Sequence, residues 1–161
     1  MEKILTSLRK IRFQDCDPFN HLNNSKYIDY FINAREDQLI EYYDIDIYAL
    51  AFKEGSGWVV GSNQIAYLNP ANTMEAVLIE SQLIQYSAKQ LTVEMRMWNQ
   101  EHNQLKSFLW VNFVHYNLKE KKAASHSKQF LNLFENVVLP IEENSFEKRR
   151  RKLAIQYSKA V

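Results

Sequence analysis

One long helical pattern, followed by strand patterns with no helix between the last three, constrains this chain most. Over residues 27–43, apolar positions recur at the spacing of a helix of about five turns. Three charged residues within it are left for solvent or ion pairs, namely Arg35, Glu36 and Glu41. A shorter helical or irregular stretch covers residues 47–53. Four strand patterns then follow, at residues 58–68, 74–86, 91–99 and 105–116.

The remaining patterns complete an α+β arrangement. Alternation over residues 10–14 predicts a first strand that ends at Asp15. The strand at 105–116 is apolar on both faces, and we expect it to be central. Strands that follow one another without helices pair antiparallel, so one antiparallel sheet should pack against the long helix. We expect one domain, with a core over residues 8–117 and a helical extension over residues 120–161.

Composition and charge exclude several classes of protein. With 46% hydrophobic and 24% charged residues, the 161-residue chain matches a soluble globular domain. A net charge of +1 gives no reason to expect nucleic acid as a partner. The start, MEKILTSLRKIRF, is interrupted by charges and matches neither a signal peptide nor a membrane span, so we expect a cytoplasmic protein without membrane partners. A single cysteine, Cys16, excludes an intramolecular disulfide and a cysteine zinc site.

The polar segment between the first strand and the long helix carries the candidate chemistry. Residues 15–27 read DCDPFNHLNNSKY, with two carboxylates, a histidine and three asparagines. This segment resembles the signature of hotdog-fold thioesterases of the 4-hydroxybenzoyl-CoA thioesterase type and of the related plant acyl-carrier thioesterases: Asp-x-Asp, a short turn, His-x-Asn-Asn, two residues and Tyr. The order of elements agrees with the hotdog fold, in which a sheet of about five strands wraps around one long helix. Many members carry glycine where this chain has Asn20, which tolerates a left-handed backbone.

The resemblance implies hydrolysis of acyl-CoA thioesters and assigns roles to individual residues. Asp17 would attack the thioester carbonyl or activate a water to do so, with His21 and Asn24 beside it. Coenzyme A would be part of the substrate, and no cofactor is implied. Backbone N–H groups ahead of the second strand, often from the partner subunit, would stabilise the oxyanion. In this chain that region is the glycine-containing segment Gly55, Ser56, Gly57 and Trp58.

Each candidate also has a structural interpretation. Asp17 could serve only as a turn former ahead of Pro18. His21 could orient the loop through hydrogen bonds without taking part in the chemistry, and Asn24 could cap the helix while shaping the site.

Two neighbours of Asp17 are assigned structural or inert roles. We expect Asp15 to pair with a backbone N–H or with Arg12. Cys16 lies between two carboxylates that disfavour its thiolate, so it is a poor nucleophile.

Metal and phosphate sites are less well supported by spacing. Asp15-x-Asp17 begins like a calcium loop, but the next ligand position is Phe19 and the final glutamate position is Lys26, so no metal is expected. The basic run at residues 148–152 is either a solvated helix face or a contact for the phosphates of coenzyme A. Lys89 is a comparable phosphate candidate.

Other functions on the same fold stay open as alternatives. They are hydrolysis of acyl-carrier-protein thioesters, an enoyl-CoA hydratase and a non-catalytic acyl-CoA sensor. The hydratase signature, Asp-x-Asn-Pro-x-His, is one residue longer than the segment from Asp17 to His21, and a sensor would lose the carboxylate. One curved sheet leaves apolar surface and two edges exposed, so we expect a homodimer or a homotetramer.

Overall fold

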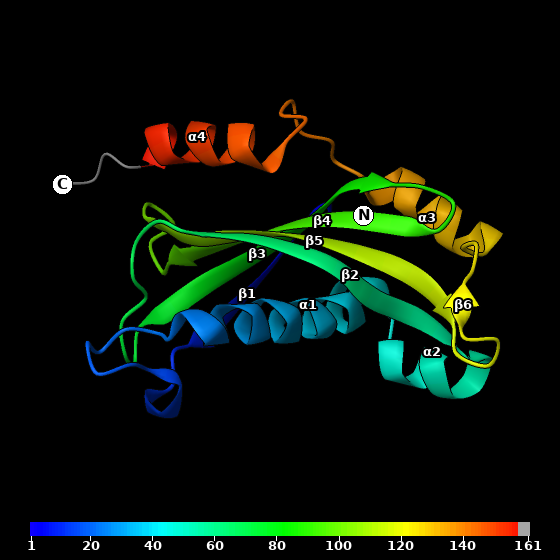
Figure 1. The fold of residues 1–161 in the computed structure, drawn as a ribbon, viewed down its shortest axis with the longest axis horizontal. Helices are drawn as coiled ribbons and strands as arrows, with labels where there is room; N and C mark the ends of the chain where they lie inside the picture. The colour runs from blue at the N-terminus through cyan, green and yellow to red at the C-terminus, as the bar shows by residue number, and fades with distance from the viewer. Residues whose placement is uncertain (158–161) are drawn as a thin grey trace.

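The computed structural model describes residues 1–157 and forms a curved sheet with helices on both faces (Figure 1). The elements, in chain order, are β1 (Ile4–Lys10), α1 (Tyr27–Tyr43), α2 (Ile47–Glu54), β2 (Ser56–Tyr67), β3 (Ala76–Tyr86), β4 (Gln90–Asn99), β5 (Leu105–Asn117), β6 (Lys122–Ala123), α3 (Lys128–Val137) and α4 (Phe146–Tyr157). Short 3-10 turns occupy Phe13–Asp15 and Asn24–Lys26. The α+β class and the hotdog arrangement predicted from the sequence are confirmed.

The sheet is antiparallel and has the order β1-β3-β4-β5-β2, with β6 paired to β5. Figure 1 shows α1 lying along one face and α4 along the opposite face. The main core lies between α1 and the sheet and includes the fully buried Phe31, Ile79 and Met95. The strand at 105–116, expected at the centre, lies one place away from it, because β4 holds the centre and β2 covers the other side of β5.

The first strand lies earlier in the chain than the alternation at residues 10–14 predicts. Residues 4–10 form β1 and pair with β3, with Leu5 fully buried. Residues 13–15 form a 3-10 turn, and Phe13 is 76% exposed. The prediction of a strand at 10–14 was therefore wrong, because a short alternation cannot distinguish a strand from a tight turn that happens to space its apolar residues in the same way.

Helix α1 begins where the polar segment ends. The Asn23 side chain accepts a hydrogen bond from the Ser25 backbone N–H at 3.0 Å and caps the preceding 3-10 turn. The helix ends at Asp44, whose φ of 56° places it in the left-handed region. Its buried stripe consists of Tyr27, Phe31, Ala34, Arg35 and Gln38. Arg35 is thus buried rather than left for solvent or an ion pair as expected, because it lies one turn after Phe31.

Helix α4 covers the outer face of the sheet through a second, smaller core. That core includes Trp98, Phe108 and Leu153. Outward-facing charged residues of β4 lie beneath it, and Glu94 is 0% exposed. Arg149 of α4 donates two hydrogen bonds to Glu94, at 2.8 and 2.7 Å. Helix α4 therefore closes the face of the sheet away from α1.

Within residues 1–157, no helix combines the length and the apolar character that crossing a membrane requires.

Candidate active site

The Asp17 turn is held by backbone hydrogen bonds. The Asp17 N–H donates to the His21 carbonyl at 2.8 Å, and the Asn20 N–H donates to the Asp17 carbonyl at 3.1 Å. Asn20 has a φ of 68°, so the left-handed position that many members fill with glycine is kept by an asparagine. The Asn20 carbonyl also accepts from the Thr73 N–H at 2.9 Å, which ties the turn to the chain ahead of β3.

The two oxygens of the Asp17 carboxylate differ in their hydrogen bonds. Oδ1 accepts hydrogen bonds from the backbone N–H groups of Phe19, at 2.9 Å, and His21, at 3.2 Å. No donor among residues 1–157 bonds to Oδ2. The turn therefore fixes the orientation of the carboxylate and leaves one oxygen free for a water or a substrate, which is the arrangement a base or nucleophile needs.

Asp17 lines a surface pocket of about 220 Å³, here called the Asp17 pocket. It is lined by Asp17, His21, Leu22, Asn24, Tyr27, Tyr67, Leu68, Asn69 and Pro70. The structure thus brings together the three candidate residues from the motif. It adds the segment 67–70 at the end of β2, which no local sequence pattern places there because only the sheet topology brings it to the start of α1.

Two tyrosines shape this pocket. The Tyr27 hydroxyl accepts from the Ala71 N–H at 3.1 Å, and burial raises the pKa of Tyr27, so its hydroxyl stays protonated at neutral pH. The Tyr67 hydroxyl donates to the Asn24 carbonyl at 3.0 Å. The rings of Tyr27 and Tyr67 pack edge to face, with centroids 5.1 Å apart. These contacts join the C-terminal end of β2 to the start of α1.

The remaining motif residues differ in their hydrogen bonds. No described residue hydrogen-bonds to the His21 ring, and Asp17 is oriented by the His21 backbone instead. Asn23, rather than Asn24, caps the turn before α1. Asp15 accepts a hydrogen bond from the Tyr30 hydroxyl at 2.8 Å, which corrects the expected partners, a backbone N–H or Arg12. A structural role for Asp15 stays a prediction.

The segment Gly55–Trp58 lies at the other end of α1. Gly55 ends α2 in the left-handed region, with a φ of 65°, whereas Gly57 is a strand residue of β2 and not part of the expected turn. The 17 residues of α1 span about 25 Å and lie between this segment and Asp17 (Figure 1). Within one chain, the structure therefore does not bring these backbone donors to the Asp17 carboxylate.

Trp58 is anchored by a pair of histidines. Its indole N–H donates to His126 Nε2 at 3.0 Å, while His126 Nδ1 lies 3.1 Å from the Ser87 carbonyl. His126 therefore acts as an acceptor at Nε2 and a donor at Nδ1, which is the neutral tautomer. The ring of His115 lies 4.9 Å away, centroid to centroid. Burial lowers the pKa of His126, and the neighbouring His115 lowers it further.

We expect stability to fall as the solution is acidified from pH 7.5 to pH 5.5. The unfolded chain protonates His126 near its ordinary pKa of 6.5, while the folded chain resists protonation. The unfolded state then binds more protons, so the free energy of unfolding decreases as the pH falls below that value. Urea unfolding of the unmodified protein and of His126→Gln measures the effect. Glutamine keeps an acceptor and does not titrate, so the free energy of unfolding of His126→Gln should fall less steeply with decreasing pH. Equal pH dependence of the two proteins would contradict this role for His126.

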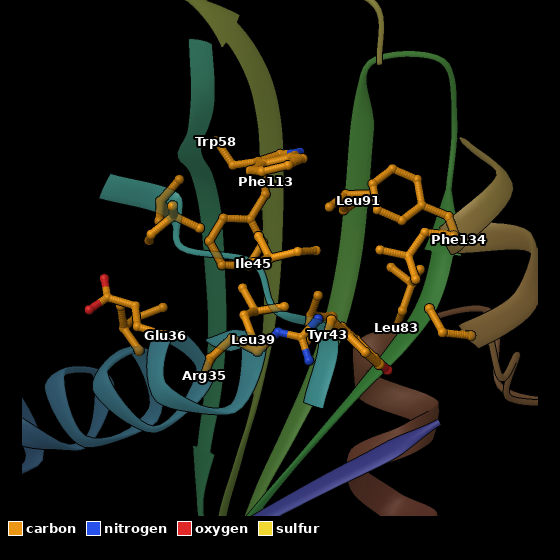
Figure 2. Close-up of a pocket in the computed structure, with 16 residues that line it drawn as sticks. Arg35, Glu36, Leu39, Tyr43, Ile45, Trp58, Leu83, Leu91, Phe113 and Phe134 are labelled. Carbon is orange, nitrogen blue, oxygen red and sulfur yellow. The ribbon is translucent and has the colours of Figure 1, made fainter. Parts of the chain in front are cut away.

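A second, largely apolar cavity of about 170 Å³ lies between α1, α3 and the sheet (Figure 2). We call it the helix-sheet cavity. Its walls include Leu39 of α1, Trp58 of β2, Leu91 of β4, Phe113 of β5 and Phe134 of α3. Arg35 and Glu36 supply its charged groups. Because Trp58 belongs to both this wall and the glycine-containing segment, the cavity lies beside the candidate oxyanion donors.

The other candidate sites find structural partners. Within the run 148–152, Arg149 is directed inward to Glu94, while Arg150 and Arg151 pair with Glu147 on the same helix. The run is therefore not simply a solvated face, and α4 lies on the sheet face opposite α1. Among residues 1–157, no cluster of three or more histidine, cysteine or acidic side chains has a geometry suited to a metal ion.

The sequence profile of the thioesterase-like superfamily matches residues 11–134. The chain belongs to this superfamily. It is accordingly an enzyme of the thioesterase class, with the matched region containing the Asp17 turn, α1 and the strands β2 to β5. No curated protein matches the chain significantly.

Several solved structures share the fold over nearly their whole length. YbaW of Escherichia coli, described as a probable thioesterase, is 24% identical with a TM-score of 0.71, covering 84% of this chain and 99% of that one. Slr0204 of Synechocystis, a 1,4-dihydroxy-2-naphthoyl-CoA thioesterase, is 16% identical with a TM-score of 0.75, covering 85% and 99%. SAV2348 of Staphylococcus aureus, solved in complex with CoA, is 13% identical with a TM-score of 0.75, covering 90% and 92%. These similarities establish the hotdog fold.

Proposed function

We propose that this thioesterase hydrolyses acyl-CoA thioesters, with Asp17 as the catalytic carboxylate. The observation that carries the proposal is the orientation of Asp17, which lines the Asp17 pocket with Oδ1 bound by two backbone N–H groups and with no donor among residues 1–157 on Oδ2. A thioester carbonyl placed in that pocket meets a fixed carboxylate oxygen. The CoA bound to the Staphylococcus aureus relative supports CoA as the carrier of the acyl group.

Thioester hydrolysis needs a base or nucleophile at the carbonyl carbon and hydrogen-bond donors at the carbonyl oxygen. In the first route, Asp17 Oδ2 takes a proton from a water molecule while the water oxygen attacks the carbonyl carbon. In the second route, Asp17 Oδ2 attacks the carbonyl carbon itself. Negative charge then develops on the carbonyl oxygen and requires N–H donors. The carbon–sulfur bond breaks as the carbonyl re-forms, and the thiolate of coenzyme A leaves and takes up a proton. In the second route, water then hydrolyses the acyl-aspartate to release the acid.

The oxyanion donors are best supplied by a second copy of the chain. Strand β2 is an edge strand, since it pairs with β5 on one side only. It is 12 residues long, roughly 40 Å, and residues 59–64 are exposed, which is an unprotected edge. Apolar side chains flank it, with Val60 48% exposed and Phe52 of α2 96% exposed. Antiparallel pairing of β2 with its copy would cover this edge and this apolar surface.

Two-fold pairing about the middle of β2 would assemble a complete site. The start of one β2 then lies opposite the end of the other, so the partner subunit's Gly57 approaches Tyr67. Tyr67 lines the Asp17 pocket and bonds to the Asn24 carbonyl. The same symmetry therefore places the partner's backbone donors next to Asp17, and each dimer contains two such sites.

The dimer is expected in solution at micromolar concentration. Sedimentation velocity or light scattering should give at least twice the 19.1 kDa mass of the chain. A stable monomer that still hydrolyses thioesters would rule out a site shared between subunits.

Gly57→Val should lower turnover more than it lowers stability. A Cβ at Gly57 meets no atom within 4 Å in the single chain, and valine suits a strand, so folding of the chain should tolerate the change. In the dimer, the added side chain would stand where the thioester has to approach the backbone. The contrasting variant is Gly55→Ala, which should mainly destabilise, because Gly55 has a positive φ and a Cβ there would lie 2.9 Å from Lys119 Cε. Thiol release and thermal unfolding, measured on both variants, separate the two effects, and unchanged turnover in Gly57→Val would contradict the role of the segment.

The proposed function is tested by thiol release across a panel of acyl-CoAs and matched acyl-carrier-protein thioesters. Hydrolysis of acyl-CoAs supports it. Hydrolysis of acyl-carrier-protein thioesters alone would identify these, and not acyl-CoAs, as the substrates. Absence of hydrolysis with every thioester would overturn the proposal.

A further inference from the structure

Arg35 is a buried cation with few partners. It is 9% exposed and comes from the buried stripe of α1. Its guanidinium has five N–H donors, and the structure assigns one hydrogen bond, from Nη1 to the Ser81 hydroxyl at 2.9 Å. No carboxylate among residues 1–157 forms an ion pair with it. Burial lowers the pKa of Arg35 to about 10, partly opposed by Tyr43, so the side chain is still positively charged at neutral pH.

The unused donors of Arg35 face the helix-sheet cavity. The described residues contain no fully buried side-chain nitrogen or oxygen without a partner, so the unbonded guanidinium nitrogens retain accessible surface. Arg35 lines the helix-sheet cavity, and Figure 2 shows its guanidinium between Leu39 and Tyr43 at the base of the apolar walls. Glu36 lines the same cavity, but its carboxylate accepts from the Tyr48 hydroxyl at 3.1 Å. A charge left unpaired in an apolar cavity is costly unless a ligand compensates it.

We infer that the helix-sheet cavity receives the acyl group and that Arg35 selects acyl groups ending in a carboxylate, the mono-CoA thioesters of small dicarboxylic acids. This inference rests on the proposed function, because the same two-fold pairing places the cavity wall at Trp58 beside the partner subunit's Asp17. A volume of about 170 Å³ is close to that of cavities that hold a single six-membered ring, which limits the acyl group to a short chain or one ring. The apolar walls suit the methylenes, and the guanidinium fork suits a terminal carboxylate.

The experiment compares adipoyl-CoA with hexanoyl-CoA, which have the same number of carbons and differ at the end of the acyl chain. The ratio of their kcat/KM values should favour adipoyl-CoA roughly tenfold or more in the unmodified protein, as expected for hydrogen bonds between charged groups. Arg35→Met should bring the ratio to about one or below. Arg151→Met is the matched control, because Arg151 is exposed on α4, and its ratio should equal that of the unmodified protein. Equal ratios in the unmodified protein and Arg35→Met would overturn the inference.

Two further measurements keep the test decisive. If Arg35→Met does not fold, Arg35→Lys replaces it: lysine keeps the charge but loses the fork, so the ratio should fall severalfold, and an unchanged ratio would contradict selection by Arg35. If the unmodified protein hydrolyses neither thioester, the panel of acyl-CoAs still decides the proposed function, and calorimetry with the same two CoA esters decides the inference. The inference is supported if adipoyl-CoA binds more tightly than hexanoyl-CoA and if Arg35→Met, or Arg35→Lys in its place, weakens that binding. Equal binding of both esters refutes it.

Discussion

Asp17→Asn is expected to lower thioester turnover by about two orders of magnitude or more, in line with the loss of a general base or nucleophile. The fold should survive, because asparagine keeps an oxygen that can accept from the Phe19 and His21 backbone N–H groups and is equally tolerated ahead of Pro18. The loss should appear in kcat with every acyl-CoA that the unmodified protein hydrolyses. Thiol release under saturating substrate measures it.

Asp15→Asn is the matched control for this variant. The Asp15 carboxylate is two residues away but bonds to the Tyr30 hydroxyl and lies outside the Asp17 pocket. Burial and the bond to Asp15 raise the pKa of Tyr30 to about 12, so that hydroxyl remains a donor in both proteins. Asp15→Asn should therefore change stability more than turnover. Near-normal activity of Asp17→Asn, or an equal loss in Asp15→Asn, would remove Asp17 from the catalytic step.

His21→Ala distinguishes the two interpretations of the histidine. The contacts favour an orienting role, since the His21 backbone, and not its ring, bonds to Asp17. The alanine variant keeps that backbone N–H, so its turnover should fall much less than that of Asp17→Asn. A loss as large as that of Asp17→Asn would show that the imidazole takes part in the chemistry.

Local sequence patterns predicted the motif and the elements apart from the first strand, because both depend on residues close together in the chain. The helix at 27–43 follows from spacing, and the left-handed position at Asn20 follows from the family resemblance together with the backbone preference of asparagine. The proximity of the end of β2 to the Asp17 turn could not be predicted in this way, because it depends on the sheet order. The placement of Arg35 was wrong for a related reason: helical spacing put it one turn after Phe31, but its charge indicated solvent or an ion pair, and only the packed structure shows a cavity that accepts it.

The outer face of the sheet shows a similar limit. Along β4, the alternation of Val93, Met95 and Met97 with polar residues is typical of a strand with one face in water. The structure instead buries both faces, because α4 closes over Glu94 and Trp98. A sequence pattern records which side chains are polar, but it does not record which of them receive ion-pair partners from a distant helix.

Glu94→Gln should lower the free energy of unfolding by about 2–4 kcal/mol, because it leaves buried arginines without their shared partner. Glu94 accepts from Arg149 twice, and from Arg96 and the Trp110 indole at 2.8 Å each. Burial alone would raise the pKa of Glu94, but the hydrogen bonds from Arg149 and the charge of Arg96 lower it below its ordinary value. The carboxylate is therefore ionised where it lies, and glutamine cannot replace its charge.

The matched control for Glu94→Gln is Glu147→Gln on the exposed surface of α4. Glu147 pairs with Arg150 and Arg151, but its side chain is 52% exposed, and such surface pairs contribute at most about 1 kcal/mol. Urea unfolding followed by tryptophan fluorescence suits both variants, because Trp98 and Trp110 lie in the core beneath α4. Since α4 and the Asp17 pocket lie on opposite faces of the sheet, Glu94→Gln should keep its turnover at temperatures where it remains folded. Equal stability of the two variants would mean that the apolar contacts of Phe146 and Leu153 hold α4 without help from the buried ion pairs.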